Sequence, residues 1–193
     1  MRDKDVRSAL RQRLAVEHAQ ELDETRVVEE FGIYGEVRVD VAVLNGKMIG
    51  YELKSERDSL KRLPKQVVWY SKILDEACIV VAENHLAHAL EIVPDWWGCA
   101  VATSENGGGV RLEETREAKP NPGIDGRTLA LLLWRDEVLT ALETRGLDRG
   151  YRSKTRSAMA QRLAEGTPLQ ELRDLVRETL KMRKGWRSTL LSA

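Results

Sequence analysis

The sequence predicts an α/β fold in which a mixed β-sheet is flanked by helices and is followed by an all-helical C-terminal extension. Three features predict it. Residues 36–54 contain two alternating runs around Asn45-Gly46, and residues 77–82 and 98–103 are apolar runs typical of buried strands. A connector rich in Pro and Gly follows at residues 119–123, and every segment beyond it has helical spacing.

The elements can be assigned in order along the chain. Apolar positions at helical spacing predict an amphipathic helix over residues 3–24. Asn-Gly between residues 36–44 and 47–54 is the strongest short signal for a β-hairpin. Pro64 is expected to mark a kink or a broken first turn in a helix. The other expected elements are a helix at 58–75, strands at 77–82, 98–103 and 110–112, and helices at 85–91, 129–143, 154–163 and 168–182.

Length and composition bound the organisation of the chain. Its 193 residues are enough for one domain with an appendage, and we predict a core at residues 1–118, a linker at 119–126 and a helical extension at 127–193. The 31 basic and 31 acidic residues cancel, so contact with nucleic acid must depend on local clusters of charge. The charged N-terminus and the lack of a long apolar stretch predict a cytoplasmic protein with no membrane partner.

A candidate metal site lies on the predicted hairpin. Asp40 is on its first strand, and Glu52 and Lys54, two residues apart, share one face of its second strand. Mg²⁺ prefers oxygen ligands, usually one or two carboxylates completed by water and phosphate. Asp40 and Glu52 can supply that pair, with the carbonyl of Leu53 as a further ligand. Lys54 can contact the attacking water or the phosphate, so the pattern predicts phosphodiester hydrolysis with Mg²⁺ or Mn²⁺.

These residues resemble a known signature. Residues 38–40 (Arg-Val-Asp), the Asn-Gly turn and residues 50–55 (Gly-Tyr-Glu-Leu-Lys-Ser) are similar to the D…(D/E)XK motif of the PD-(D/E)XK nuclease superfamily. Val39 stands where that superfamily often has a proline. The wider context, including residues 58–70 and 94–98, resembles the sce7726 family of bacterial and phage proteins, which is placed in that superfamily.

The resemblance implies a restriction-endonuclease-like α-β-β-β-α-β core in which Asp40 and Glu52 bind metal and Lys54 assists the nucleophile. A glutamate on the first core helix often completes such sites. Glu30 is the candidate, with Glu29 as its rival, because adjacent helical positions point about 100° apart and only one can face the site. The resemblance also places Gln66 near the active site.

Local basic clusters are the candidates for binding nucleic acid. A set directly after the second strand of the hairpin is expected to steer a DNA backbone into the site: Arg57, Lys61, Arg62 and Lys65. Residues 149–156 and 181–187 are also basic, and they either hold phosphates or form solvated helix faces.

Two functions follow from these patterns. The first is a Mg²⁺-dependent deoxyribonuclease of bacterial or phage origin. The second is a nuclease-fold module with weak or no catalysis that binds DNA or a protein partner. In either case, a homodimer or a protein partner is expected to associate through the C-terminal helices. The sequence does not distinguish DNA from RNA as the substrate, nor single strands from double strands.

Overall fold

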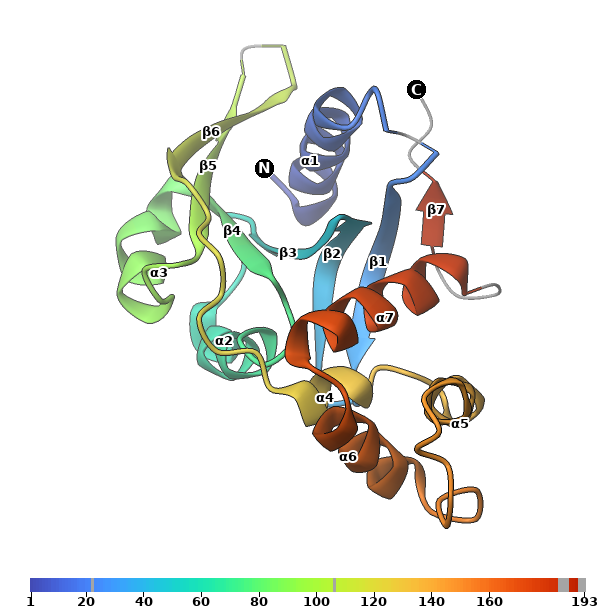
Figure 1. Ribbon diagram of the computed structural model, residues 1–193. Coiled ribbons are helices and arrows are strands. Elements are labelled where there is room, and N and C mark those ends of the chain that lie inside the picture. Colours follow the sequence, from blue (N-terminus) through green and yellow to red (C-terminus); the bar gives the residue numbers. More distant parts are fainter. Residues whose placement is uncertain (22, 106, 184–187, 191–193) are drawn as a thin grey trace. The chain divides into compact units, whose positions relative to one another are not determined.

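The computed structural model describes residues 1–21, 23–105, 107–183 and 188–190 (Figure 1). The chain divides into two compact units: Met1–Pro122 with Arg187–Ala193, and Gly123–Trp186. The boundary falls inside the predicted linker at residues 119–126.

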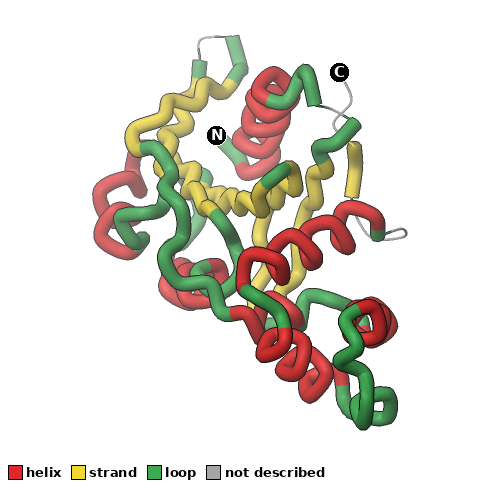
Figure 2. Tube along the Cα trace, in the orientation of Figure 1, coloured by secondary structure: helices red, strands yellow, loops and turns green. Residues whose placement is uncertain are grey.

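The first unit contains a mixed sheet, which Figure 2 shows as a continuous set of strands. Within the described residues its order is β6-β5-β4-β3-β2-β1-β7. Neighbours from β3 to β5 are parallel, and all other neighbours are antiparallel. The strands are β1 (Arg26–Ile33), β2 (Val37–Asn45), β3 (Lys47–Lys54), β4 (Glu76–Ala82), β5 (Gly98–Ser104), β6 (Val110–Arg116) and β7 (Ser188–Leu190).

The expectation of an all-helical extension through residue 193 is wrong at β7. Ser188 pairs with Val28 and Leu190 with Arg26, so this short segment adds an edge strand to β1 in the first unit. A segment of three residues is too short for a helical or a strand period to be recognised in the sequence. Backbone pairing with a distant strand decides their conformation.

Helices cover both faces of this sheet. Helix α1 (Asp3–Glu17) lies against one face of the sheet (Figure 1). Its Leu10 and Leu14 belong to a buried apolar cluster that includes Leu53 of β3. Alternation along a strand sends Glu52 to the opposite face, where it meets α2 (Leu63–Tyr70). The remaining elements of this unit are α3 (Leu86–Ile92) and the 3₁₀ turns η1 (Leu60–Arg62) and η2 (Glu83–His85).

Local signals explain where several elements begin and end. The predicted hairpin is confirmed, with Gly46 at φ 60° between β2 and β3. Pro64 lies in the first turn of α2, so the expected broken start is confirmed, with η1 preceding it. Helix α1 ends at Glu17 rather than at residue 24, because the chain turns there to enter β1.

The second unit is helical within its described residues. The helix predicted over residues 129–143 is two helices, because Trp134 is extended and donates its N–H to Glu137, which starts a new helix. Arg183 ties the unit together by pairing with Glu137 and donating to the carbonyl of Leu132. The helices are α4 (Gly126–Ala130), α5 (Arg135–Thr144), α6 (Arg156–Gly166) and α7 (Leu169–Met182). None of the described helices of either unit is long and apolar enough to cross a membrane.

A substitution at Gly50 of β3 tests how tightly the sheet face that carries Glu52 is packed. A Cβ at this position would lie 2.3 Å from Cδ1 of Leu74 and 3.1 Å from Cγ1 of Val39, both buried. We expect Gly50→Ala to lower the free energy of unfolding by about 1–3 kcal/mol, because buried neighbours must shift. Urea unfolding measures it. Gly32→Ala on β1 is the control, since nothing lies within 4 Å of its Cβ position, and equal losses would contradict the prediction.

Candidate active site

The β2-β3 ladder ends beside Asp40. Its last pair is Val41 with Tyr51, and beyond it the Oδ2 atom of Asp40 accepts the backbone N–H of Leu53 at 2.8 Å. The N–H and C=O of one strand residue point to the same side of the strand. The carbonyl of Leu53 therefore also faces the side occupied by Asp40. This orientation is the one required of the predicted backbone ligand.

Glu30 lies across from Asp40 on β1. The flanking pairs are Glu29 with Val41 and Phe31 with Val39, and Glu30 itself has φ 53°, in the left-handed region. The expectation that Glu30 occupies the first core helix is wrong, because α1 has already ended and residues 26–33 form a strand.

The pleat of β2 reverses at this point. Val41 belongs to the cluster packed under α1, whereas Cγ1 of Val39 lies 3.1 Å from the Cβ position of Gly50, on the face that meets α2. Residues two apart on a regular strand share a face. The irregularity therefore lies at Asp40, between them, where its carboxylate meets the backbone of β3.

A buried polar network surrounds Glu52. Its Oε1 atom accepts hydrogen bonds from Nζ of Lys54 at 2.5 Å and from Nε2 of Gln66 at 2.6 Å. Its Oε2 atom accepts a hydrogen bond from the hydroxyl of Tyr70 at 2.5 Å. The side chains of Glu52 and Lys54 are only 1% and 3% exposed. Burial and the neighbouring Glu52 raise the pKa of Tyr70 well above its ordinary value, so its hydroxyl is a donor. Glu52, Lys54 and Gln66 thus meet as the sequence predicts.

The electrostatic environment of Asp40 differs from that of an ordinary surface carboxylate. Burial and then the charge of Glu52 raise its pKa from 3.8 to about 7, against the opposing effects of the Leu53 N–H, Lys54 and Arg7. Asp40 is therefore largely removed from water and lies close to a second carboxylate.

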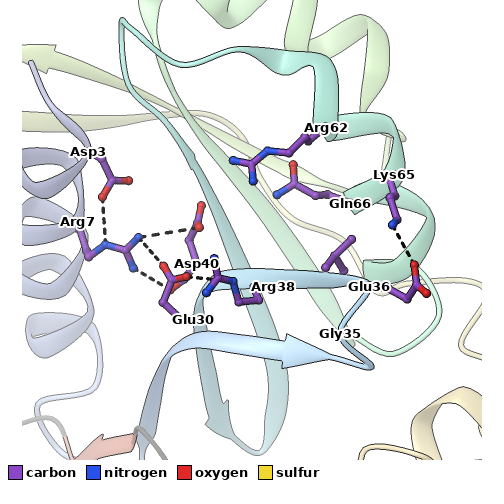
Figure 3. Close-up of a pocket in the computed structure, with 11 residues that line it drawn as sticks. Asp3, Arg7, Glu30, Gly35, Glu36, Arg38, Asp40, Arg62, Lys65 and Gln66 are labelled. Carbon is purple, nitrogen blue, oxygen red and sulfur yellow. Dashed lines mark hydrogen bonds and ion pairs between the residues drawn. The ribbon is translucent and has the colours of Figure 1, made fainter.

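Arg7 of α1 is a functional candidate that the sequence did not indicate (Figure 3). Its guanidinium donates to the backbone oxygen of Asp40 at 2.8 Å and to Oε1 of Glu30 at 3.3 Å, and lies 3.9 Å from Oδ1 of Asp40. Asp3, one turn earlier, contacts it at 3.4 Å. Only this Asp3–Arg7 spacing is visible in the sequence, and it is common on solvated helices. Arg38 contacts the other oxygen of Glu30 at 3.4 Å.

A cavity of about 530 Å³, drawn in Figure 3, is lined by Arg7, Glu30, Arg38, Asp40 and Gln66 among others, whereas the buried Glu52 and Lys54 do not line it. Of the basic residues expected to steer DNA, Arg62 and Lys65 line it, and Lys65 pairs with Glu36 at 2.9 Å. Arg57 and Lys61 are exposed and do not line it. Glu30 lines it as well. Glu29 does not, and its carboxylate lies 3.0 Å from Arg11.

The oxygen donors fit a metal site of limited size. Across the described residues there is no group of three or more His, Cys, Asp or Glu side chains placed to hold a metal ion. Mg²⁺, however, often uses only one or two carboxylates and keeps several waters. Asp40, Glu52 and the carbonyl of Leu53 are oxygen donors of the kind that Mg²⁺ takes, although both oxygens of Glu52 already accept hydrogen bonds. A cation there would oppose the burial and the charge of Glu52 that raise the pKa of Asp40 to about 7. Glu30 is engaged by Arg7 and Arg38.

The C-terminal basic clusters have acidic partners in part. Arg152 pairs with Asp148 at 2.9 Å and with Glu143 at 3.1 Å, both on an exposed surface. Arg183 is buried, with its guanidinium 4.2 Å from the Trp134 ring centroid, so it serves the packing of the helical unit. Residues 184–187, which complete the second cluster, lie outside the described residues.

The raised pKa of Asp40 predicts a specific pH dependence of stability. Between about pH 4 and 7 the unfolded chain has lost this proton while the folded protein retains it. Unfolding then releases a proton, so this contribution to the free energy of unfolding falls as pH rises. We expect the free energy of unfolding of the wild type to fall relative to that of Asp40→Asn as the pH rises over this range. Urea unfolding in metal-free buffer measures it.

The matched control is Asp136→Asn, whose carboxylate is 96% exposed. Its stability difference from the wild type should stay nearly constant over the same pH range. A constant difference for Asp40→Asn as well would show that Asp40 is ionised in the folded protein throughout.

Comparison with known proteins gives one family. The family model described as bacteriophage P4 protein cII matches residues 1–193. No match is found among the curated proteins. Among solved structures, the SPO1766 protein of unknown function from Silicibacter pomeroyi is similar, with 17% identity and a TM-score of 0.47, over 80% of this chain and 95% of that one.

Proposed function

The chain belongs to the bacteriophage P4 protein cII family, and we propose that it is a Mg²⁺- or Mn²⁺-dependent nuclease that hydrolyses phosphodiester bonds of DNA in the cytoplasm. One observation carries the proposal. Glu52 and Lys54 form a buried, hydrogen-bonded ion pair at a strand end, one strand from the desolvated Asp40. Removing two charges from water is costly, and an apolar pair would satisfy packing alone.

The order of elements supports a PD-(D/E)XK assignment. From the N-terminus it is α1, β1, β2, β3, α2, β4, which is the α-β-β-β-α-β order implied by the sequence resemblance. Asp40 lies on the second strand and Glu52 and Lys54 on the third, which are the two strands of the predicted hairpin. The restriction-endonuclease-like fold is thus part of the proposal.

Each side chain would have a distinct role. Asp40, Glu52 and the carbonyl of Leu53 would hold the metal, which supplies Lewis acidity and an activated water. Lys54 is held by Glu52 at 2.5 Å, and Gln66 lies 3.4 Å from its ammonium. That positioned positive charge would orient the attacking water or offset charge on the phosphoryl oxygens.

Cleavage of DNA by the purified protein tests this function. With Mg²⁺ or Mn²⁺ we expect nicking or degradation of plasmid or single-stranded DNA, read on gels. Asp40→Asn and Lys54→Met should each lower the rate by about 10²-fold or more, because each removes charge placed for the reaction. Lys47→Met, on the exposed part of the same strand, should leave it unchanged.

Two results would refute catalysis by this site. One is the absence of metal-dependent cleavage with any DNA substrate. The other is cleavage that persists in Asp40→Asn, which would indicate a contaminating nuclease. Circular dichroism of each variant separates loss of activity from loss of folding.

A second function, a non-catalytic module that binds DNA or a protein partner, is favoured by the internal neutralisation of the carboxylates. Arg7 and Arg38 contact Glu30, Arg7 also contacts Asp40, and Lys54 pairs with Glu52. No added cation is needed to balance this set. In that function, exposed apolar residues of α7 such as Leu169 and Met182 are the candidate contacts for a protein partner or a second copy.

Metal affinity of an Arg7 variant discriminates between the two functions. If the site binds metal, Arg7 is a competing positive charge, and Arg7→Met should bind Mn²⁺ roughly tenfold more tightly than the wild type. Arg11→Met is the control, because Arg11 lies one turn later on α1 and pairs with Glu29 instead. Isothermal titration measures both. Failure of all three proteins to bind Mn²⁺ would favour the module.

A further inference from the structure

A stripe of positive and aromatic side chains runs along α2 and the turns at its two ends, with Lys65 and Trp69 on the helix, Arg62 in η1 before it and Lys72 in the turn after it. The spacings between the four residues are three, four and three, which places their side chains on one side of a helical segment: Arg62, Lys65, Trp69 and Lys72. Arg62 and Lys65 line the 530 Å³ cavity beside Asp40. The ammonium of Lys72 lies 4.5 Å from the Trp69 ring centroid. Among the described residues, neither Arg62 nor Lys72 forms an ion pair with a carboxylate.

The tip of the β1-β2 hairpin places a second aromatic ring beside this stripe. The Tyr34 ring lies 6.0 Å from the Trp69 ring, centroid to centroid, with the planes tilted by 35°. One helical turn away, Lys65 pairs with Glu36 at 2.9 Å. The residues after Tyr34, from Gly35 to Val37, line the cavity. The hairpin tip and the helix therefore both extend from the Tyr34–Trp69 ring pair to residues that line the cavity.

Tyr34 is an unexpected residue for its backbone conformation. It has φ 59°, and Gly35 follows at φ 73°, so both turn positions are left-handed. Asn and Gly adopt such turns at little cost, whereas a bulky side chain is disfavoured there. A tyrosine at this position costs stability that its ring must offset, and strained residues of this kind cluster at binding sites. Both rings are partly exposed.

We propose that Tyr34 and Trp69 are a base-stacking platform for single-stranded nucleic acid, with Arg62 and Lys72 as phosphate contacts on either side. An aromatic ring flanked by cations is the usual combination for unpaired bases, which offer open faces for stacking. Bases in a duplex are already stacked on their neighbours. The biological role of this platform rests on the proposed nuclease function. The substrate class is then single-stranded nucleic acid, which passes the two rings before it reaches Asp40.

Binding without metal tests the platform separately from catalysis. Fluorescence anisotropy in EDTA would compare a labelled oligothymidine of about 12 nucleotides, an abasic oligonucleotide of equal length and a duplex. We expect the wild type to bind oligothymidine roughly tenfold more tightly than the abasic strand. This comparison requires no variant.

Tyr34→Asn gives the sharpest variant. Asn suits the left-handed turn, so the melting temperature should be retained or raised, while binding of oligothymidine should weaken roughly tenfold. Tyr34→Phe should keep the affinity, because the ring remains. Trp134→Asn is the matched control, since Trp134 is a half-exposed ring near a cation, Arg183, in the helical unit.

The outcomes separate the two proposals. Equal affinity for oligothymidine and the abasic strand, tighter binding of duplex, or unchanged binding by Tyr34→Asn would overturn the platform. A lower melting temperature with unchanged binding would assign Tyr34 to packing alone and overturn it as well. Base-dependent binding without metal-dependent cleavage would support the platform while refuting the nuclease.

Discussion

The buried ion pair between Glu52 and Lys54 is the interaction on which the first unit depends. A charge pair out of water is tolerated only when its remaining hydrogen-bonding groups have partners. Gln66 and Tyr70 provide these from α2, and Tyr70 also contacts the carbonyl of Arg38 on β2. Trp97 stacks on Tyr70 at 5.5 Å. The same contacts thus dock α2 on the sheet and hold Lys54 in place beside Asp40.

The region around Asp40 combines an irregular sheet with balanced charge. The ladder between β2 and β3 stops at Val41, and Glu30 takes a left-handed conformation opposite Asp40. Arg7 then reaches the backbone oxygen of Asp40 and the side chain of Glu30 from α1. The strand irregularity exposes oxygen atoms, and the neighbouring cations stabilise them. In the proposed function, a metal ion would compete there with the internal cation Arg7.

Elements set by neighbouring residues were predictable. The Asn45-Gly46 hairpin places Asp40 near Glu52 because the turn determines the register of both strands. The spacing of Glu52 and Lys54 determines that they share a face. Gln66 was placed near the site by resemblance, and the structure shows it bonded to Glu52. The apolar spacing predicted a helix over residues 58–75, whereas α2 spans only Leu63–Tyr70, with the 3₁₀ turn η1 before it and a turn after it.

The sequence by itself therefore determined strands β2 to β6, the hairpin register and the charged trio of Asp40, Glu52 and Lys54, because these depend on residues close together in the chain. Only the tertiary structure decided that Glu30 lies on a strand, that Arg7 contacts Asp40 from 33 residues away, and that Tyr34 packs on Trp69. Such contacts join separate elements, and their geometry follows from how helices pack on the sheet. No local period or spacing encodes it.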